Sequence, residues 1–168
     1  MQANKDQLPK MYPEFSKLSM PYRQAVYQEL TASDKAHLWD EHFKAYLRTR
    51  PQLSSAQQQV VAEAQSLARD ATVHDPAKVT TPELQARLSH LTSASIAEFG
   101  KDEAGAVFAT LGPSELAAPI IQCHCNTTFD FCGGGGKCYE PPTVDCRYVT
   151  AGCGPLWVTP CNGGCLYW

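Results

Sequence analysis

The first 122 residues of this 168-residue chain contain no cysteine and only three of its 11 glycines. All eight cysteines lie between Cys123 and Cys165. Disulfides are therefore excluded within the larger part of the chain, which must fold by burying apolar side chains. The last 46 residues are too few to bury enough apolar area for stability, and we expect their cysteines to stabilise them instead.

The chain also lacks a long apolar run and an excess of positive charge. No stretch of about 18 apolar residues occurs, so we expect no transmembrane segment. The 14 Lys+Arg against 17 Asp+Glu give a formal charge of −3, which argues against a nucleic-acid partner held through phosphate contacts. In residues 123–168 two basic residues stand against three acidic ones, which disfavours a simple cationic membrane-disrupting peptide.

The pattern of apolar residues predicts a mainly α fold, with an N-terminal bundle of about five helices. The first helix is expected near residues 20–30, the second ends at Pro51 and the third begins at Ser54. The fourth is expected from Thr81 to Gly100, and the fifth around 104–111. Thr31 or Ser33 is the expected cap of the second helix. Ser54 with Gln57 three residues later predicts a capping box. The expected domains are a helical leader or carrier, residues 1–118, and a disulfide-rich effector or binding module, residues 119–168.

No catalytic set can be assembled from the helical part. His37 and His42 are five residues apart, which separates their side chains by about 140° around a helix. The zinc-protease signature instead needs two histidines four apart, with Glu directly after the first. We therefore expect structural or solvated histidines, no catalytic residues, no cofactor and no enzyme activity.

Two interpretations compete for the cysteines of the tail. A zinc ion at Cys123, Cys125, Cys161 and Cys165 would leave four cysteines unexplained. Four disulfides explain all eight and imply an oxidising compartment outside the cell, so we favour disulfides and no metal. The sequence does not decide the pairing. The predicted disulfide cysteines are Cys123, Cys125, Cys132, Cys138, Cys146, Cys153, Cys161 and Cys165.

The remaining tail residues indicate turns and short strands. Gly133–Gly136 supply the positive φ angles that a crowded cystine core needs. Strands are expected at Arg147–Thr150 and Leu156–Thr159, between turn residues. Asn126-Thr127-Thr128 matches a glycosylation acceptor, which matters only in a glycosylating host.

Seven of the 16 aromatic residues lie in the tail, more than 46 residues can readily hide. Some are expected to shield disulfides or to pack on the helices. Others are expected to form a contact surface for a lipid interface, a cell-wall polymer or a partner protein, because Tyr and Trp suit such boundaries. The predicted surface or target-binding residues are Trp157, Tyr167, Trp168, Phe129 and Phe131.

Both parts of the chain contain distinctive motifs. In the tail they are Cys123-His124-Cys125, Phe131-Cys132-Gly133-Gly134-Gly135 and Pro160-Cys161-Asn162-Gly163-Gly164-Cys165. In the helical part they are Tyr22-Arg23-Gln24-Ala25-Val26, Leu30, Lys35, Leu38-Trp39 and Leu53-Ser54-Ser55-Ala56-Gln57. Together they resemble the bacteriocin fulvocin C-related family, and the resemblance covers most of the chain. It implies a secreted bacterial protein whose cysteine-rich end is, or derives from, an antibacterial polypeptide with four disulfides, and it implies no catalytic residues.

The expected function is that of a secreted bacteriocin-like antimicrobial protein or its precursor, with the tail as the active part and the bacterial cell envelope or a surface partner as its target. The alternative is a secreted structural or adhesive protein that self-associates or binds a surface through the aromatic tail. Residues 1–20 show no basic-then-apolar signal peptide. We expect that signal to be removed before residue 1, or export to use another route. Leu116–Ile121 is the candidate cleavage region.

Overall fold

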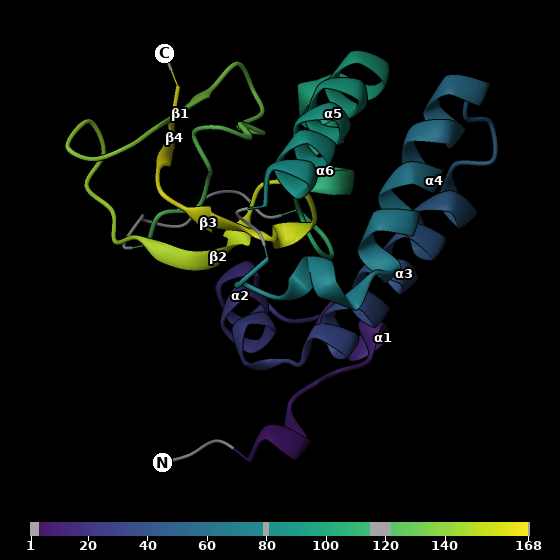
Figure 1. The fold of residues 1–168 in the computed structure, drawn as a ribbon, viewed down its shortest axis with the longest axis horizontal. Helices are drawn as coiled ribbons and strands as arrows, with labels where there is room; N and C mark the ends of the chain where they lie inside the picture. Colours follow the sequence, from purple (N-terminus) through teal and green to yellow (C-terminus); the bar gives the residue numbers. More distant parts are fainter. Residues whose placement is uncertain (1–3, 79–80, 115–121, 168) are drawn as a thin grey trace.

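The computed structural model describes residues 4–78, 81–114 and 122–167. These residues form a mainly helical chain with six α-helices, followed by short antiparallel strands in the C-terminal region, as predicted (Figure 1). The α-helices are α1 (Tyr12–Phe15), α2 (Met20–Glu29), α3 (Ala32–Thr49), α4 (Ser55–Arg69), α5 (Pro82–Phe99) and α6 (Lys101–Phe108). Three 3₁₀ segments accompany them: η1 (Lys5–Gln7), η2 (Ala71–His74) and η3 (Pro155–Trp157).

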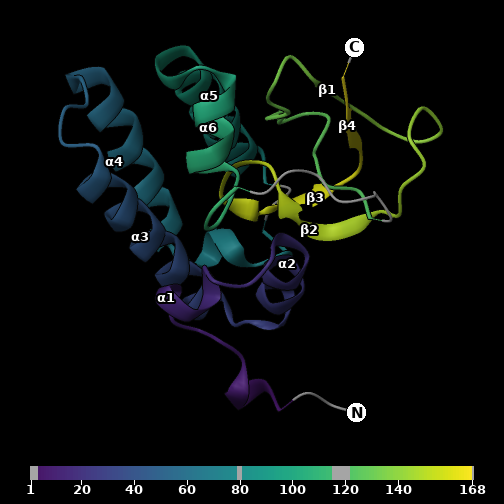
Figure 2. The same ribbon diagram turned by 180° about the vertical axis from the view of Figure 1, so that it is seen from behind.

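The longer helices pack on their neighbours in the sequence. Helix α3 contacts α4, α4 contacts α5, and α5 contacts α6, so that α3 and α4 form a hairpin at one side of the molecule (Figure 2). The single-turn helix α1 was not predicted, because four residues are too few to show a helical period. It has proline in its first turn and places Phe15 fully in the core.

The helix boundaries follow the capping residues. The side chain of Thr31, not that of Ser33, caps α3 by accepting a hydrogen bond from the Asp34 backbone N–H at 3.1 Å. The predicted capping box of α4 is confirmed, because Ser54 and Gln57 each accept from the other's backbone N–H at 3.1 Å. Gly100, with φ 75°, ends α5 and allows the chain to turn directly into α6.

The tail contains two small antiparallel pairs. Strand β1 (Lys137–Tyr139) pairs with β4 (Gly164–Leu166), and β2 (Val149–Cys153) pairs with β3 (Thr159–Cys161) across an irregular register. The predicted strand at 147–150 overlaps β2. The one predicted at 156–159 is wrong over its first half, because Leu156 and Trp157 have φ values of 58° and 53° and form the tight turn η3.

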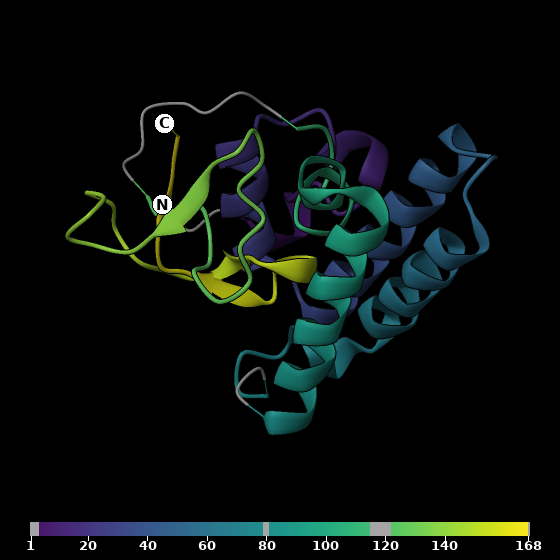
Figure 3. The ribbon, with the colours of Figure 1, turned by 90° about the horizontal axis from the view of Figure 1, so that it is seen from above.

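One hydrophobic core joins the helices to the tail. Besides side chains of the helical part, the cluster of buried residues includes four from the tail: Phe129, Leu156, Trp157 and Val158. Segment η3 contacts α5, and the yellow segment that contains η3 and β3 lies beside the helices in the view from above (Figure 3). The predicted domain boundary at residues 118 and 119 lies outside the described residues. Among the residues described, no helix is long and apolar enough to cross a membrane.

Candidate functional site: the cysteine-rich tail and its contact with the helices

All eight cysteines of the tail are joined in four disulfides, and no free thiol remains. The pairs are Cys123–Cys146, Cys125–Cys138, Cys132–Cys165 and Cys153–Cys161. The disulfides lie in two groups of two. Cys123–Cys146 and Cys153–Cys161 pack together beside β2 and β3, and the other two pack together beside β1 and β4. Each strand pair of the tail therefore packs on its own pair of buried disulfides.

Three sulfur atoms in the second group approach one another as metal ligands would. The Sγ atoms of Cys125, Cys132 and Cys165 lie within 4.8 Å of one another. All three belong to the disulfides Cys125–Cys138 and Cys132–Cys165, and zinc coordination requires thiolates. The packing of two neighbouring disulfides accounts for this cluster.

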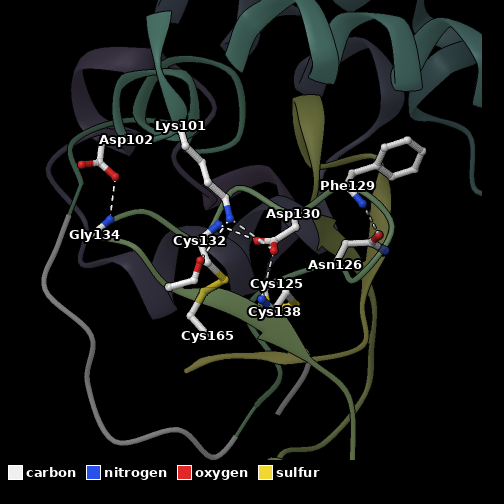
Figure 4. A network of polar contacts seen from close by, with 11 residues as sticks. Lys101, Asp102, Cys125, Asn126, Phe129, Asp130, Cys132, Gly134, Cys138 and Cys165 are labelled. Carbon is white, nitrogen blue, oxygen red and sulfur yellow. Dashed lines mark hydrogen bonds and ion pairs between the residues drawn. A yellow bond between two sulfur atoms is a disulfide. The ribbon is translucent and has the colours of Figure 1, made fainter. Parts of the chain in front are cut away.

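Asp130 joins the second disulfide group to helix α6 (Figure 4). Its two carboxylate oxygens accept hydrogen bonds from the backbone N–H groups of Cys132, at 2.8 Å, and Cys138, at 3.1 Å. The same carboxylate forms an ion pair with the Lys101 ammonium at 3.3 Å, and that ammonium also donates to the Gly136 carbonyl at 3.1 Å. One carboxylate thus fixes a residue of each disulfide and connects both to the start of α6.

The glycine run lies against the same end of α6. The Asp102 carboxylate accepts a hydrogen bond from the Gly134 N–H at 2.6 Å (Figure 4). A Cβ on Gly133 would lie 2.5 Å from that carboxylate oxygen, so a side chain there would displace Asp102 from its contact. Gly134 and Gly135 have φ values of 63° and 78°, so the predicted positive φ is confirmed for these two and is wrong for Gly133 and Gly136. The run therefore brings the tail close to the helix.

Asn126, the candidate glycosylation acceptor, organises the first turn of the tail instead. Its side chain is 5% exposed, and its Nδ2 donates to the Pro160 carbonyl at 2.8 Å. Its Oδ1 accepts from the N–H groups of Thr128 and Phe129. The structure corrects the glycosylation hypothesis, because the nitrogen that a glycan would need is buried and already bonded.

Two of the predicted surface residues are instead part of the core. Trp157 is 2% exposed, donates its indole N–H to the Ala109 carbonyl at 2.8 Å, and packs edge-on against Tyr27 with ring centroids 5.2 Å apart. Phe129 is 4% exposed, and Phe131 is half-buried against the same core. The expectation of a contact surface is therefore wrong for Trp157 and Phe129, because both rings pack among the buried side chains of the helical core.

Among the described residues of the tail, the aromatic side chains that are mostly exposed are tyrosines. Tyr167, a predicted surface residue, is 59% exposed, and Tyr148, which was not singled out, is 58% exposed. Tyr167 packs beside the glycine run, where a Cβ on Gly136 would lie 2.5 Å from its ring. Trp168 lies outside the described residues. The accessible aromatic surface of the described tail is therefore smaller than the composition suggested.

His42 is buried and neutral at the junction of α3 with the end of α6. Its Nε2 donates to the Val107 carbonyl at 2.9 Å, while its Nδ1 accepts from the Gly112 N–H at 3.3 Å and lies 3.0 Å from the Tyr12 hydroxyl. Because the Gly112 N–H donates to Nδ1, the neutral ring carries its proton on Nε2. Burial lowers the pKa of His42 to about 4. His42 is therefore structural, as expected for the histidines.

His74 is also buried and lies in a hydrogen-bonded chain that reaches the tail. The Trp39 indole N–H donates to the Tyr27 hydroxyl at 3.2 Å, and that hydroxyl lies 3.3 Å from both His74 Nδ1 and the Leu156 carbonyl. His74 Nε2 donates to the Ala68 carbonyl at 2.8 Å, and burial lowers its pKa. The chain satisfies the polar atoms that the shared core buries.

Sequence reasoning missed the residues that attach the tail to the helices, which are Lys101, Asp102, Asp130 and Tyr27. It also assigned Asn126 to a glycan and not to the turn that it organises. Asp130 lies two residues before Cys132, a position from which an aspartate accepts a backbone N–H in a turn. That local pattern was available in the sequence. The pairing of Asp130 with Lys101 was not visible in the sequence, because it depends on how α6 packs against the tail.

No protein-family model, curated protein or solved structure matches this chain.

Proposed function

We propose that this protein is a secreted, bacteriocin-like antibacterial protein, or the precursor of one, in which the cysteine-rich tail contacts the envelope of a target bacterium. The observation that carries the proposal is the pairing of all eight tail cysteines in four disulfides. Disulfides form and persist in oxidising compartments outside the cytosol. The resemblance of both parts of the sequence to fulvocin C-related proteins supports the same assignment.

The exposed tyrosines of the tail are the proposed contact residues. Tyr148 and Tyr167 combine an apolar ring with a hydroxyl and are more than half exposed. Such side chains bind at boundaries between water and an apolar or polysaccharide surface. Trp157 serves the core in the intact chain, so the full-length protein is the form in which the activity should first be assayed.

The test is a growth-inhibition assay with the oxidised full-length chain on a panel of bacteria. We expect inhibition by the wild type, and a loss of potency in the double variant Tyr148→Ser/Tyr167→Ser. Tyr22→Ser is the matched control, because Tyr22 is an exposed tyrosine of helix α2. Absence of inhibition by the disulfide-bonded wild type on every strain would refute the proposal. An equal loss in the control would refute the role of the tail.

The second candidate is a secreted structural or adhesive protein, and the shared core favours it. Because Trp157 and Phe129 complete the helical core, the two parts suit a single permanent unit better than a carrier and a released peptide. Sedimentation of the oxidised chain and its retention on bacterial cell-wall material test this candidate. A strict monomer without retention would reject it.

A further inference from the structure

Two adjoining hollows lie where the tail meets η2 and the start of α3. The first has a volume of about 260 Å³, and tail and helical residues both line it, among them Tyr27, Lys35, His74, Tyr148, Trp157 and Val158. The second is more open and shares Lys35, His74 and Pro76 with the first. We call the two hollows together the Lys35 groove.

Lys35 is the cation that both hollows share, and its ammonium, which has no hydrogen-bond partner in the described part of the chain, is open to solvent. The residue is only 9% exposed, and its ammonium lies 5.0 Å from the centroid of the Tyr27 ring. Among the described residues it has neither an ion pair nor a side-chain hydrogen bond. Lys35 also lies in the first turn of α3, where the helix dipole favours negative charge. Burial lowers the pKa of this ammonium, and the charge of the Glu29 carboxylate acts in the opposite direction.

The other buried polar groups of the groove already have partners. His74 uses both ring nitrogens, and the Tyr27 hydroxyl accepts from the Trp39 indole. Most of the remaining wall is apolar, formed by Trp157, Val158 and prolines. A ligand that fits this wall therefore offers one negative charge to Lys35 and an apolar body to the rest.

We propose that the Lys35 groove binds a small monocarboxylate with an apolar body, of the kind represented by a medium-chain fatty acid. The carboxylate pairs with the Lys35 ammonium, and the apolar body lies against Trp157 and Val158 at the junction of the tail and the helices. A second carboxylate on the ligand is disfavoured, because the carboxylate of Asp75 lines the outer hollow.

Octanoate is the probe, titrated by calorimetry into the oxidised full-length chain, with Trp fluorescence as a second readout. We expect saturable binding that weakens by about tenfold or more in Lys35→Met, since that change removes a charge-assisted contact but keeps the length of the side chain. Lys17→Met, at an exposed lysine, is the matched control and should bind as the wild type does. Octanol should bind at least about tenfold more weakly than octanoate.

Each alternative outcome overturns the proposal. No saturable binding of octanoate to the wild type removes the site, and equal binding by Lys35→Met or by octanol removes the role of the charge.

The melting temperature of the free protein controls for folding. We expect Lys35→Met to melt at the same or a higher temperature, because it replaces a charge that has no ion pair at a largely apolar wall. A marked fall in melting temperature would show that Lys35 has a structural partner and would overturn the premise. These measurements use no bacteria, so their outcome is independent of the growth assay.

Discussion

The helical part and the tail are stabilised in different ways. The described helical residues bury a continuous set of apolar side chains from α1 to α6, with Trp39, Phe43 and Phe108 at its centre. The tail has two small interiors made mainly of disulfides. Its large apolar side chains, such as Trp157 and Leu156, lie in the helical core instead. The tail is thus held by disulfides, and it contributes Phe129, Leu156, Trp157 and Val158 to the core of the helical part.

This difference implies that the two parts depend on each other unequally. The helices contribute capped ends and most of a core, which a cooperative fold needs. The tail contributes local crosslinks and a few large side chains. Removing the crosslinks should therefore abolish the order of the tail but only reduce the stability of the helices.

Reduction of the four disulfides should have the largest effect. Each bridge contributes about 2–4 kcal/mol to stability, which a tail of this size cannot replace by burial. We expect the tail to lose its order under reducing conditions, while the far-UV circular dichroism keeps most of its helical signal. Hydrogen exchange followed by mass spectrometry measures this by region, with the oxidised chain as control. Tail amides that stay protected after reduction would show that the tail does not depend on its disulfides for order.

The substitution Trp157→Ala should have the second-largest effect. Removing a buried tryptophan leaves a cavity and costs about 3–5 kcal/mol, although all four disulfides remain. Denaturant unfolding of the oxidised variant measures this loss, and we expect the helices to be destabilised by a change in the tail. Tyr167→Ala is the matched control at an exposed aromatic residue of the same tail, with an expected effect within about 0.5 kcal/mol. Equal effects of the two changes would show that the core is not shared.

The helical part was more predictable from the sequence than the tail. Ser54 with Gln57 and the Gly100 stop act within a few residues of the chain, so local patterns locate α4 and the end of α5. The disulfide content followed from the number of cysteines, but their pairing depends on contacts between distant residues. Trp157 was misplaced for the same reason, because composition shows that a ring is present and not which core receives it.

Acidification should act on the helical part through His42. Its pKa in the fold, about 4, lies below the ordinary value of 6.5, so the unfolded chain binds the proton more readily between these values. The stabilisation is complete above pH 6.5 and is lost as the pH falls toward 4, by about 3 kcal/mol in total. Unfolding at a series of pH values measures this slope.

The matched variants separate His42 from other acid effects. His42→Gln cannot take up a proton in this range, so its stability should depend less steeply on pH than that of the wild type. His37→Gln, at an exposed histidine of the same helix, should keep the wild-type slope. A wild-type slope in His42→Gln would mean that His42 does not govern the acid response of the helices.

The smallest expected effect comes from Asp130, which lies between the two parts. Asp130→Asn keeps one oxygen acceptor but replaces the other with an N–H₂ group, and it removes the ion pair with Lys101. We expect a loss of about 1–2 kcal/mol, since one backbone N–H loses its acceptor and the charge assistance disappears. The disulfides should hold the tail together, so the change should appear as faster amide exchange at Cys132 and Cys138 rather than as unfolding.

The matched control is Asp145→Asn, at an exposed aspartate of the same tail, which should change neither the stability nor the exchange of these amides. If Asp130→Asn leaves both amides as protected as in the wild type, the disulfides alone position this part of the tail against α6.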